Sequence, residues 1–164
     1  MTKPSARANC FDASALVKVY AEEPGSAIVR EYFFHQAPTR YTTPFCFYEA
    51  LNILKTKWRF RDQLSEAQYR SACFALTAWF RSSSRYIKDI DLTDIQVFND
   101  VQEIANKHSL DISDAFQIVS VKSGYFSALA NESQTLLITA DQGLATAARA
   151  EGAKVWYILG EPPP

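Results

Sequence analysis

Short apolar runs alternate along this chain with longer segments in which apolar residues recur every three or four positions. The short runs are typical of buried strands, and the longer segments are typical of amphipathic helices. Strands that alternate with helices form a parallel sheet that helices cover on its faces. The sequence therefore predicts an α/β fold. The expected strands are residues 9–11, 40–42, 86–90, 136–139 and 155–158.

Local signals indicate where several of the expected helices begin. Pro44 is a favourable first helical residue, and Ser65 with Gln68 forms a capping box, as Thr93 does with Gln96. In the helix that follows Ser65, we expect Tyr69, Ala72, Phe74, Leu76 and Phe80 to face inward. The expected helices are residues 14–22, 26–34, 44–61, 65–81, 93–108, 113–124 and 142–151.

The length and composition predict one globular domain. The chain has 164 residues, of which 48% are hydrophobic, and this is enough for a single core. We expect a domain over residues 9–158, a disordered leader over 1–8 and a disordered Pro-rich tail over 159–164. No apolar run reaches the ~20 residues that span a bilayer. Three cysteines without a CxxC spacing fit reduced thiols in a cytoplasmic protein.

Four acids from distant parts of the chain stand at the ends of apolar runs. Asp12 and Asp141 each follow an expected strand directly, and Glu49 and Asp114 lie in the first turns of expected helices. In parallel α/β sheets, functional sites form in the crevice beyond the carboxyl ends of the strands. The four side chains are therefore expected to share one acidic pocket.

Such a pocket favours a divalent cation, because several neighbouring carboxylates cannot all stay ionised at little cost. Mg²⁺ suits a site made only of oxygen ligands, and two such ions can promote hydrolysis of a phosphodiester. Asp12 and Asp141 are the expected direct ligands, Asp114 completes the site, and Glu49 binds metal or orients the attacking water. Ser14, Thr139 and Asp111 are expected to support these groups from behind.

Helix capping is an alternative explanation for most of these acids. Asp12 and Asp141 each precede a helix and could simply cap it. Asp111 and Asp114 are three residues apart, so one could be the cap and the other an acid in the first turn, and which of them belongs to the site stays open. Glu49 follows an aromatic run and has no comparable capping explanation.

The charge is divided unevenly along the chain. Residues 1–90 hold 13 Lys and Arg against 8 Asp and Glu, whereas residues 91–164 hold 4 against 10. Within the basic half, Trp58 is surrounded by basic residues that could stack on and neutralise single-stranded nucleic acid. A solvated helical face explains the same pattern equally well. The candidate RNA-binding residues are Lys55, Lys57, Arg59 and Arg61.

Four short segments, in this order and spacing, resemble the PIN-domain family and, within it, the VapC-type toxins. They are Phe11-Asp12-Ala13-Ser14, Tyr48-Glu49-Ala50-Leu51-Asn52, Ser113-Asp114-Ala115-Phe116 and Thr139-Ala140-Asp141-Gln142-Gly143.

The resemblance implies a three-layer α/β/α fold with a mostly parallel sheet of about five strands. It implies a Mg²⁺- or Mn²⁺-dependent endoribonuclease with the acidic quartet Asp12, Glu49, Asp114 and Asp141, and it favours tRNA as the substrate. It also implies a homodimer and a cognate antitoxin. Two alternatives are an inactive PIN-like module for binding or dimerisation, and a metal-dependent phosphatase acting on small substrates.

Overall fold

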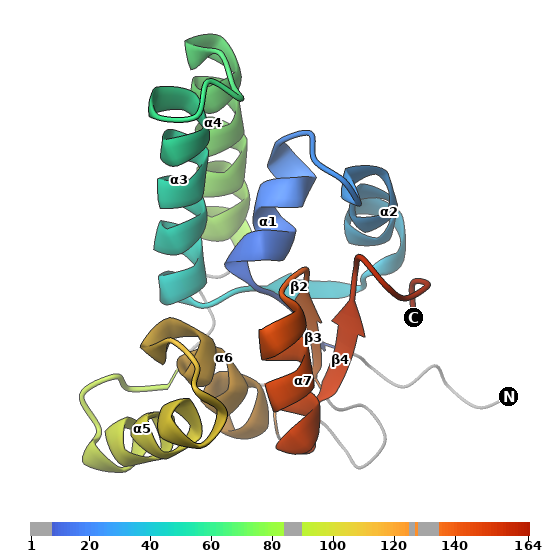
Figure 1. The fold of residues 1–164 in the computed structure, drawn as a ribbon. Coiled ribbons are helices and arrows are strands. Elements are labelled where there is room, and N and C mark those ends of the chain that lie inside the picture. Colours follow the sequence, from blue (N-terminus) through green and yellow to red (C-terminus); the bar gives the residue numbers. More distant parts are fainter. Residues whose placement is uncertain (1–7, 84–89, 125–126, 128–134) are drawn as a thin grey trace, which may run out of the picture.

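A four-stranded sheet forms the centre of the computed structural model, which describes residues 8–83, 90–124, 127 and 135–164. All neighbouring strands are parallel, in the order β2-β1-β3-β4 (Figure 1). The prediction of about five strands is wrong for the described residues, and the strand expected at 86–90 lies outside them except for Ile90. The strands are β1 (Ala8–Phe11), β2 (Thr39–Tyr41), β3 (Leu136–Thr139) and β4 (Lys154–Tyr157).

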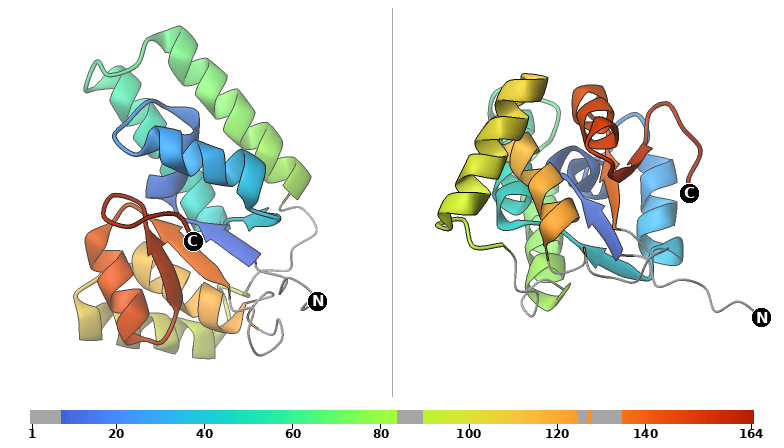
Figure 2. Two further views of the ribbon diagram at one scale, coloured as in Figure 1. Left: turned by 90° about the vertical axis from the view of Figure 1, so that its right-hand side faces the viewer. Right: turned by 90° about the horizontal axis from the view of Figure 1, so that it is seen from below.

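Helices connect the strands and cover both faces of the sheet (Figures 1 and 2). Helices α3 and α4 form a long hairpin that extends away from the sheet (Figure 1). The helices are α1 (Ala13–Tyr20), α2 (Ser26–Glu31) with the π-helical turn η1 (Tyr32–Gln36), α3 (Pro44–Arg59), α4 (Glu66–Ser83), α5 (Ile95–His108), α6 (Ile112–Ser123) and α7 (Gln142–Ala150).

Two hydrophobic cores lie on opposite faces of the sheet, because successive side chains of a strand point to opposite sides. In β1, Phe11 belongs to the core with α1 to α4, whereas Cys10 belongs to the core with α5 to α7. In β3, Ile138 and Leu137 divide in the same way. The predicted α/β/α layering with a parallel sheet is therefore present.

Several local predictions can be compared with the structure. Ser65 and Gln68 do form a reciprocal capping box, with bonds of 2.8 and 3.1 Å. The second box is wrong, since Asp94 caps α5 by accepting from the backbone N–H of Gln96. The prediction that Phe74 faces inward is also wrong, because its side chain is 78% exposed.

The two ends of the predicted domain differ slightly from expectation. Strand β1 begins at Ala8, one residue before the predicted domain start. After β4, Glu161 accepts from Arg149 at 2.7 Å and from the backbone N–H of Tyr157 at 3.2 Å. These bonds hold the beginning of the expected disordered tail against α7 and β4. Among the described helices, none is both long and apolar enough to cross a bilayer.

Candidate active site

The order of the strands brings Asp12 and Asp141 to adjacent positions at one edge of the sheet. Strand β1 pairs with β2 on one side and β3 on the other, so the chain connections leave this central pair in opposite directions. Such a switch point opens a crevice at the carboxyl ends of the strands. Asp12 follows β1 directly, and Asp141 follows β3 after one residue. The helices α1, α3, α6 and α7 all start near this edge (Figure 1).

The Asp12 carboxylate is buried and held at both oxygens. Oδ1 accepts from the Ser14 hydroxyl at 2.7 Å and from the backbone N–H of Ala15 at 3.0 Å, so Asp12 caps α1. Oδ2 accepts from the Thr139 hydroxyl at 2.7 Å. Capping and site geometry thus coexist in Asp12, because the bonds that satisfy the helix end also fix the carboxylate at the sheet edge.

Ser14 and Thr139 connect the two halves of this edge. The Ser14 hydroxyl accepts from the backbone N–H of Ala140 at 2.9 Å, and the Thr139 hydroxyl accepts from the backbone N–H of Asp141 at 2.9 Å. Asp141 itself caps α7 through a 2.9 Å bond from the backbone N–H of Leu144. Ser14 and Thr139 therefore connect the carboxylate of Asp12 to the backbone that leads into α7, and their role in supporting a metal site stays a prediction.

Glu49 and Asp114 approach the same edge from helices. Glu49 lies in the second turn of α3, whose N-cap is Thr43, and Asp114 is the third residue of α6. Asp111 stands at the N-cap position of α6, but its side chain accepts no hydrogen bond from the backbone N–H groups of that helix. Because Asp111 is exposed and Asp114 is half-buried, the geometry favours Asp114 as the inner acid.

The negative charges of neighbouring acids raise the pKa of Asp12, Glu49 and Asp114. Burial raises the pKa of Asp114 to about 7, with further contributions from the negative charges of Asp141, Asp12 and Glu49. The side chain of Glu49 is exposed, but partial desolvation raises its pKa, and the negative charges of Asp12, Asp111 and Asp141 add to this effect. Burial raises the pKa of Asp12 although the bonds from Ser14, Ala15 and Thr139 oppose it. The site holds more negative charge than its surroundings balance.

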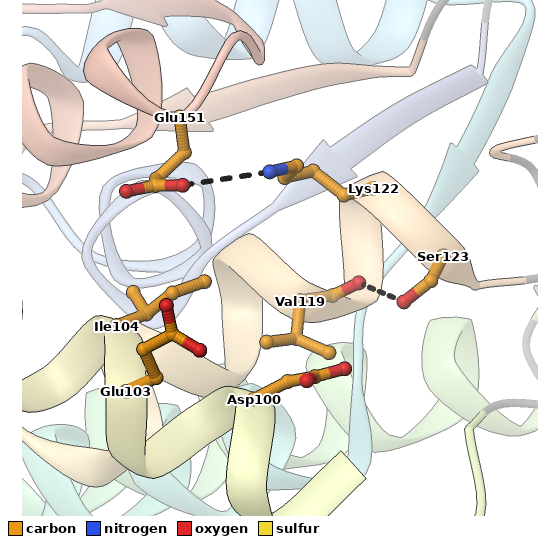
Figure 3. A pocket seen from close by; sticks show the side chains of 7 residues that line it. All are labelled: Asp100, Glu103, Ile104, Val119, Lys122, Ser123 and Glu151. Carbon is orange, nitrogen blue, oxygen red and sulfur yellow. Dashed lines mark hydrogen bonds and ion pairs between the residues drawn. The ribbon is translucent and has the colours of Figure 1, made fainter. Parts of the chain in front are cut away.

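No cationic side chain compensates this charge in the described part of the chain. None of the ion pairs formed there includes any of the four acids. Glu151, at a separate hollow between α5, α6 and α7, shows the contrast, because it pairs with Lys107, His108 and Lys122. Figure 3 shows the pair with Lys122. Hydrogen bonds from Lys107 and His108 lower the pKa of Glu151 to about 2.

The donor chemistry of the site fits a hard divalent cation. All four candidate ligands are carboxylates, and Mg²⁺ prefers oxygen ligands while keeping several of its waters. Within the described ranges, however, no three His, Cys, Asp or Glu side chains are gathered closely enough to form a ready coordination group. The carboxylates therefore fit the ion by type and charge, and ion binding would have to draw their side chains together.

Comparison with protein families agrees with this arrangement. The model of the family described as PIN domain matches residues 10–150 of the chain. The chain belongs to the PIN-domain family. No curated protein matches the sequence. PIN domains are generally nucleases and typically use divalent metals, so the family indicates a nuclease hydrolase.

The four predicted RNA-binding residues of this PIN domain have different surroundings. Lys55, Arg59 and Arg61 are exposed near the end of α3, and the Arg59 guanidinium lies 5.5 Å from the centre of the Trp58 ring. Lys57 instead pairs with Glu23 and donates to Gln63 at 3.1 Å. Trp58 stacks on Tyr69 of α4 with ring centres 4.7 Å apart. Lys57 is thus engaged in holding the hairpin.

Two polar residues of the PIN domain near the acids were missed by sequence reasoning. Gln117 on α6 and Thr43 before α3 are both fully buried, and the Gln117 amide donates to the Thr43 hydroxyl at 2.7 Å. Neither residue belongs to a motif, and they are 74 positions apart. No signal in the sequence pairs them, because only the packing of α6 beside the start of α3 brings them together.

Proposed function

We propose that the protein is a metal-dependent endoribonuclease and the toxin component of a VapBC-type toxin–antitoxin pair. The observation that carries the proposal is the meeting of Asp12, Glu49, Asp114 and Asp141 at one sheet edge without a cationic partner among the described residues. Carboxylates that lie near one another repel when they are ionised, and a cation that binds between them relieves this repulsion. Membership of a family of nucleases supports the hydrolytic reaction.

Each acid has a role in this proposal that follows from its surroundings. Asp12, fixed by Ser14, Thr139 and the start of α1, supplies a preorganised ligand. Asp141 and Asp114 complete the ligand set from α7 and α6. Glu49, whose pKa partial desolvation raises above that of a free glutamate, is suited to accept a proton from the attacking water.

A bound Mg²⁺ or Mn²⁺ would neutralise the carboxylates and provide Lewis-acid stabilisation of the charge that develops during phosphodiester hydrolysis. The chain itself holds the acids at one sheet edge, where no Lys, Arg or His side chain of the described residues forms an ion pair with them. RNA reaches these acids from the side of the α3–α4 hairpin, where the exposed basic residues lie. We propose tRNA as the first substrate class to examine.

Cleavage of a total tRNA pool by the purified protein tests the catalytic part of the proposal. Discrete fragments are expected with Mg²⁺ or Mn²⁺, and they should disappear with EDTA and in Asp12→Asn. Equal cleavage by wild type and Asp12→Asn would reject the assignment of the site. No cleavage under any metal condition would favour the alternative of an inactive PIN-like binding module, and absence of Mn²⁺ binding in a titration would support that alternative independently.

The toxin part of the proposal concerns partners. We propose a cytoplasmic homodimer that is blocked by an antitoxin encoded next to its own gene. Co-expression of the neighbouring small reading frame should give a complex that co-purifies and lacks ribonuclease activity. Full nuclease activity after co-expression would leave the nuclease in place and remove its assignment as a toxin.

A further inference from the structure

A buried hydrogen bond connects the two helices that bring Glu49 and Asp114 to the site. The side-chain amide of Gln117 donates to the hydroxyl of Thr43 at 2.7 Å, and both side chains are shielded from solvent, with exposures of 1% and 0%. Gln117 follows Asp114 by one turn of α6, so the two side chains are neighbours on that helix. Thr43 is the N-cap of α3 and accepts from the backbone N–H of Cys46 at 3.2 Å.

Thr43 is itself connected to the strand that leads to Asp12. Its neighbour Thr42 donates from its hydroxyl to the backbone carbonyl of Phe11 at 2.6 Å. A continuous path of hydrogen bonds and backbone therefore joins α6, the start of α3 and the end of β1. These three elements carry Asp114, Glu49 and Asp12. An edge-to-face pair of rings, Phe45 and Phe116, also joins α3 and α6, with ring centres 5.0 Å apart.

Core packing alone does not explain the choice of glutamine. The Gln117 Oε1 atom is buried and has no hydrogen-bond partner among the described residues, and an unsatisfied buried polar atom is unfavourable. Rotating the amide by 180° would keep a bond to the Thr43 hydroxyl and leave the nitrogen unpaired instead. A Met side chain of similar volume would fill the same space without an unsatisfied atom. What glutamine adds is a directional bond.

That bond acts against a repulsive force. Asp12, Glu49 and Asp114 approach the same sheet edge from the end of β1, from α3 and from α6, and ionised carboxylates that face one another repel. A contact between apolar rings permits some sliding of the helices, whereas a hydrogen bond between a helix cap and a buried amide fixes both distance and direction.

We propose that Gln117 is a positioning residue, which through Thr43 holds α6 against the start of α3, so that the side chains of Asp114 and Glu49 can close together around one divalent cation. The inference rests on the proposed function, because it assigns Gln117 a role in the metal affinity of that same site. Gln117 itself touches neither the ion nor RNA in this proposal.

The test is a calorimetric titration of Mn²⁺ into the metal-free full-length protein and its variants. Gln117→Met should bind Mn²⁺ about tenfold more weakly, the size of effect seen when groups behind metal ligands are lost. Its melting temperature without metal should not fall, because the substitution also removes the unsatisfied Oε1 atom. Thr43→Ser, which keeps the hydroxyl, should bind Mn²⁺ as wild type does.

The matched control is Ser123→Ala on the same helix. Ser123 donates to the backbone carbonyl of Val119 at 2.7 Å at the far end of α6 (Figure 3), so the variant loses one hydrogen bond without affecting the start of α3. It should keep the wild-type Mn²⁺ affinity. In a double-mutant cycle, Thr43→Val and Gln117→Met should be non-additive in Mn²⁺ affinity, because either one removes the same bond.

Wild-type Mn²⁺ affinity in a folded Gln117→Met variant would overturn the positioning role. If Gln117→Met does not fold, Thr43→Val decides in the same way. If the wild-type protein binds no Mn²⁺, the proposed function fails, and crystal structures of the metal-free wild type and Gln117→Met judge the positioning role separately. A displaced α6 would then support it, and an unmoved α6 would overturn it.

Discussion

Asp12 shows how a side chain that caps a helix can also be a candidate for the proposed acidic site. Its Oδ1 atom satisfies the backbone N–H of Ala15, whereas Oδ2 is tied to Thr139 on the neighbouring strand. An asparagine keeps one oxygen for the cap but loses the negative charge. Substitutions at this residue can therefore separate folding from the proposed chemistry.

We expect Asp12→Asn to fold with a melting temperature near that of wild type and to lose metal-dependent RNA cleavage. Asp12→Ala should lose the activity and also about 1 kcal/mol of stability, since the cap disappears. Asp94→Asn is the control, because Asp94 caps α5 through the N–H of Gln96 and lies on a different element. Cleavage assays and urea denaturation of the three variants give the comparison. An inactive Asp94→Asn protein would show that the loss is not specific to the site.

Asp114 makes the stability of the metal-free protein depend on pH. Burial and the neighbouring acids raise its pKa in the folded state from 3.8 to about 7. Between these values the folded protein binds more protons than the unfolded chain, so this residue lowers stability as pH rises from about 4 to 7. Above pH 7 its destabilising effect is complete.

We therefore expect Asp114→Asn to be more stable than wild type at pH 8 in the presence of EDTA, because the amide is never charged. The difference between the two proteins should shrink as pH falls toward 4, where the wild-type carboxyl is protonated in the folded state as well. Chemical denaturation at several pH values measures it. A variant that is equally stable or less stable at pH 8 would contradict the repulsion between these acids.

At the scale of elements, the α3–α4 hairpin is joined to α1 through Glu23. This carboxylate pairs with Lys18 at 2.9 Å and with Lys57, and both ammonium groups are largely buried. Burial raises the pKa of Glu23, but the bonds from Lys57 and Lys18 outweigh this and lower it. The contribution to stability is therefore present above pH 4.5 and is lost as pH falls through the folded-state pKa.

Glu23→Gln should destabilise the protein by about 1–3 kcal/mol at pH 7, because it leaves two partly buried cations without their partner. The matched control is Glu22→Gln, whose exposed pair with Arg30 spans 2.6 Å and should matter by less than about 0.5 kcal/mol. Urea denaturation at pH 7 and pH 3 measures both variants. A difference between Glu23→Gln and wild type that does not shrink at pH 3 would contradict the ionic origin of the effect.

Elements with a local signal could be predicted from the sequence, and those that depend on packing could not. Ser65 and Gln68 determine the start of their helix through bonds between residues three apart, so the pattern sufficed. Phe74 was expected to face inward, yet α4 packs through Ala72 and Leu76, and Phe74 lies between them on the other side. The hydrophobicity of Phe74 carried no information about which side of α4 the neighbouring helices cover.

The candidate site divides in the same manner. Asp12 and Asp141 follow strands and Asp114 lies in the first turn of α6, and parallel topology brings such positions to one sheet edge. Glu49 was expected in the first turn of its helix but lies in the second turn of α3. Asp111 and Asp114 could not be separated without the orientation of α6. The contact between Gln117 and Thr43 required the packing of α6 beside the start of α3, and no sequence pattern encodes a pairing between residues 74 positions apart.

At the scale of the whole molecule, the uneven charge of the sequence becomes an arrangement in space. The acidic half supplies α5, α6 and α7, whereas exposed basic residues lie at the far end of α3 on the projecting hairpin (Figures 1 and 2). Lys55 and Arg59 follow Glu49 on the same helix by about 9 and 15 Å along its axis. Under the proposed function, a strand of RNA that contacts these basic residues has to cover only this distance along α3 to reach Glu49.

We expect the triple variant Lys55→Ala, Arg59→Ala, Arg61→Ala to bind single-stranded RNA more weakly while its Mn²⁺ affinity stays unchanged. If all three residues contact phosphates, the slope of log affinity against log salt should decrease by about 2, since each single-strand contact contributes about 0.7. Lys57 is left intact because its pair with Glu23 stabilises the hairpin. Lys107→Ala is the control on the acidic half, where the residue pairs only at the surface with Glu151. RNA affinity measured at several salt concentrations tests this prediction. An unchanged slope in the triple variant would mean that the exposed basic residues of α3 are a solvated face. RNA would then reach the acids along another side of the molecule.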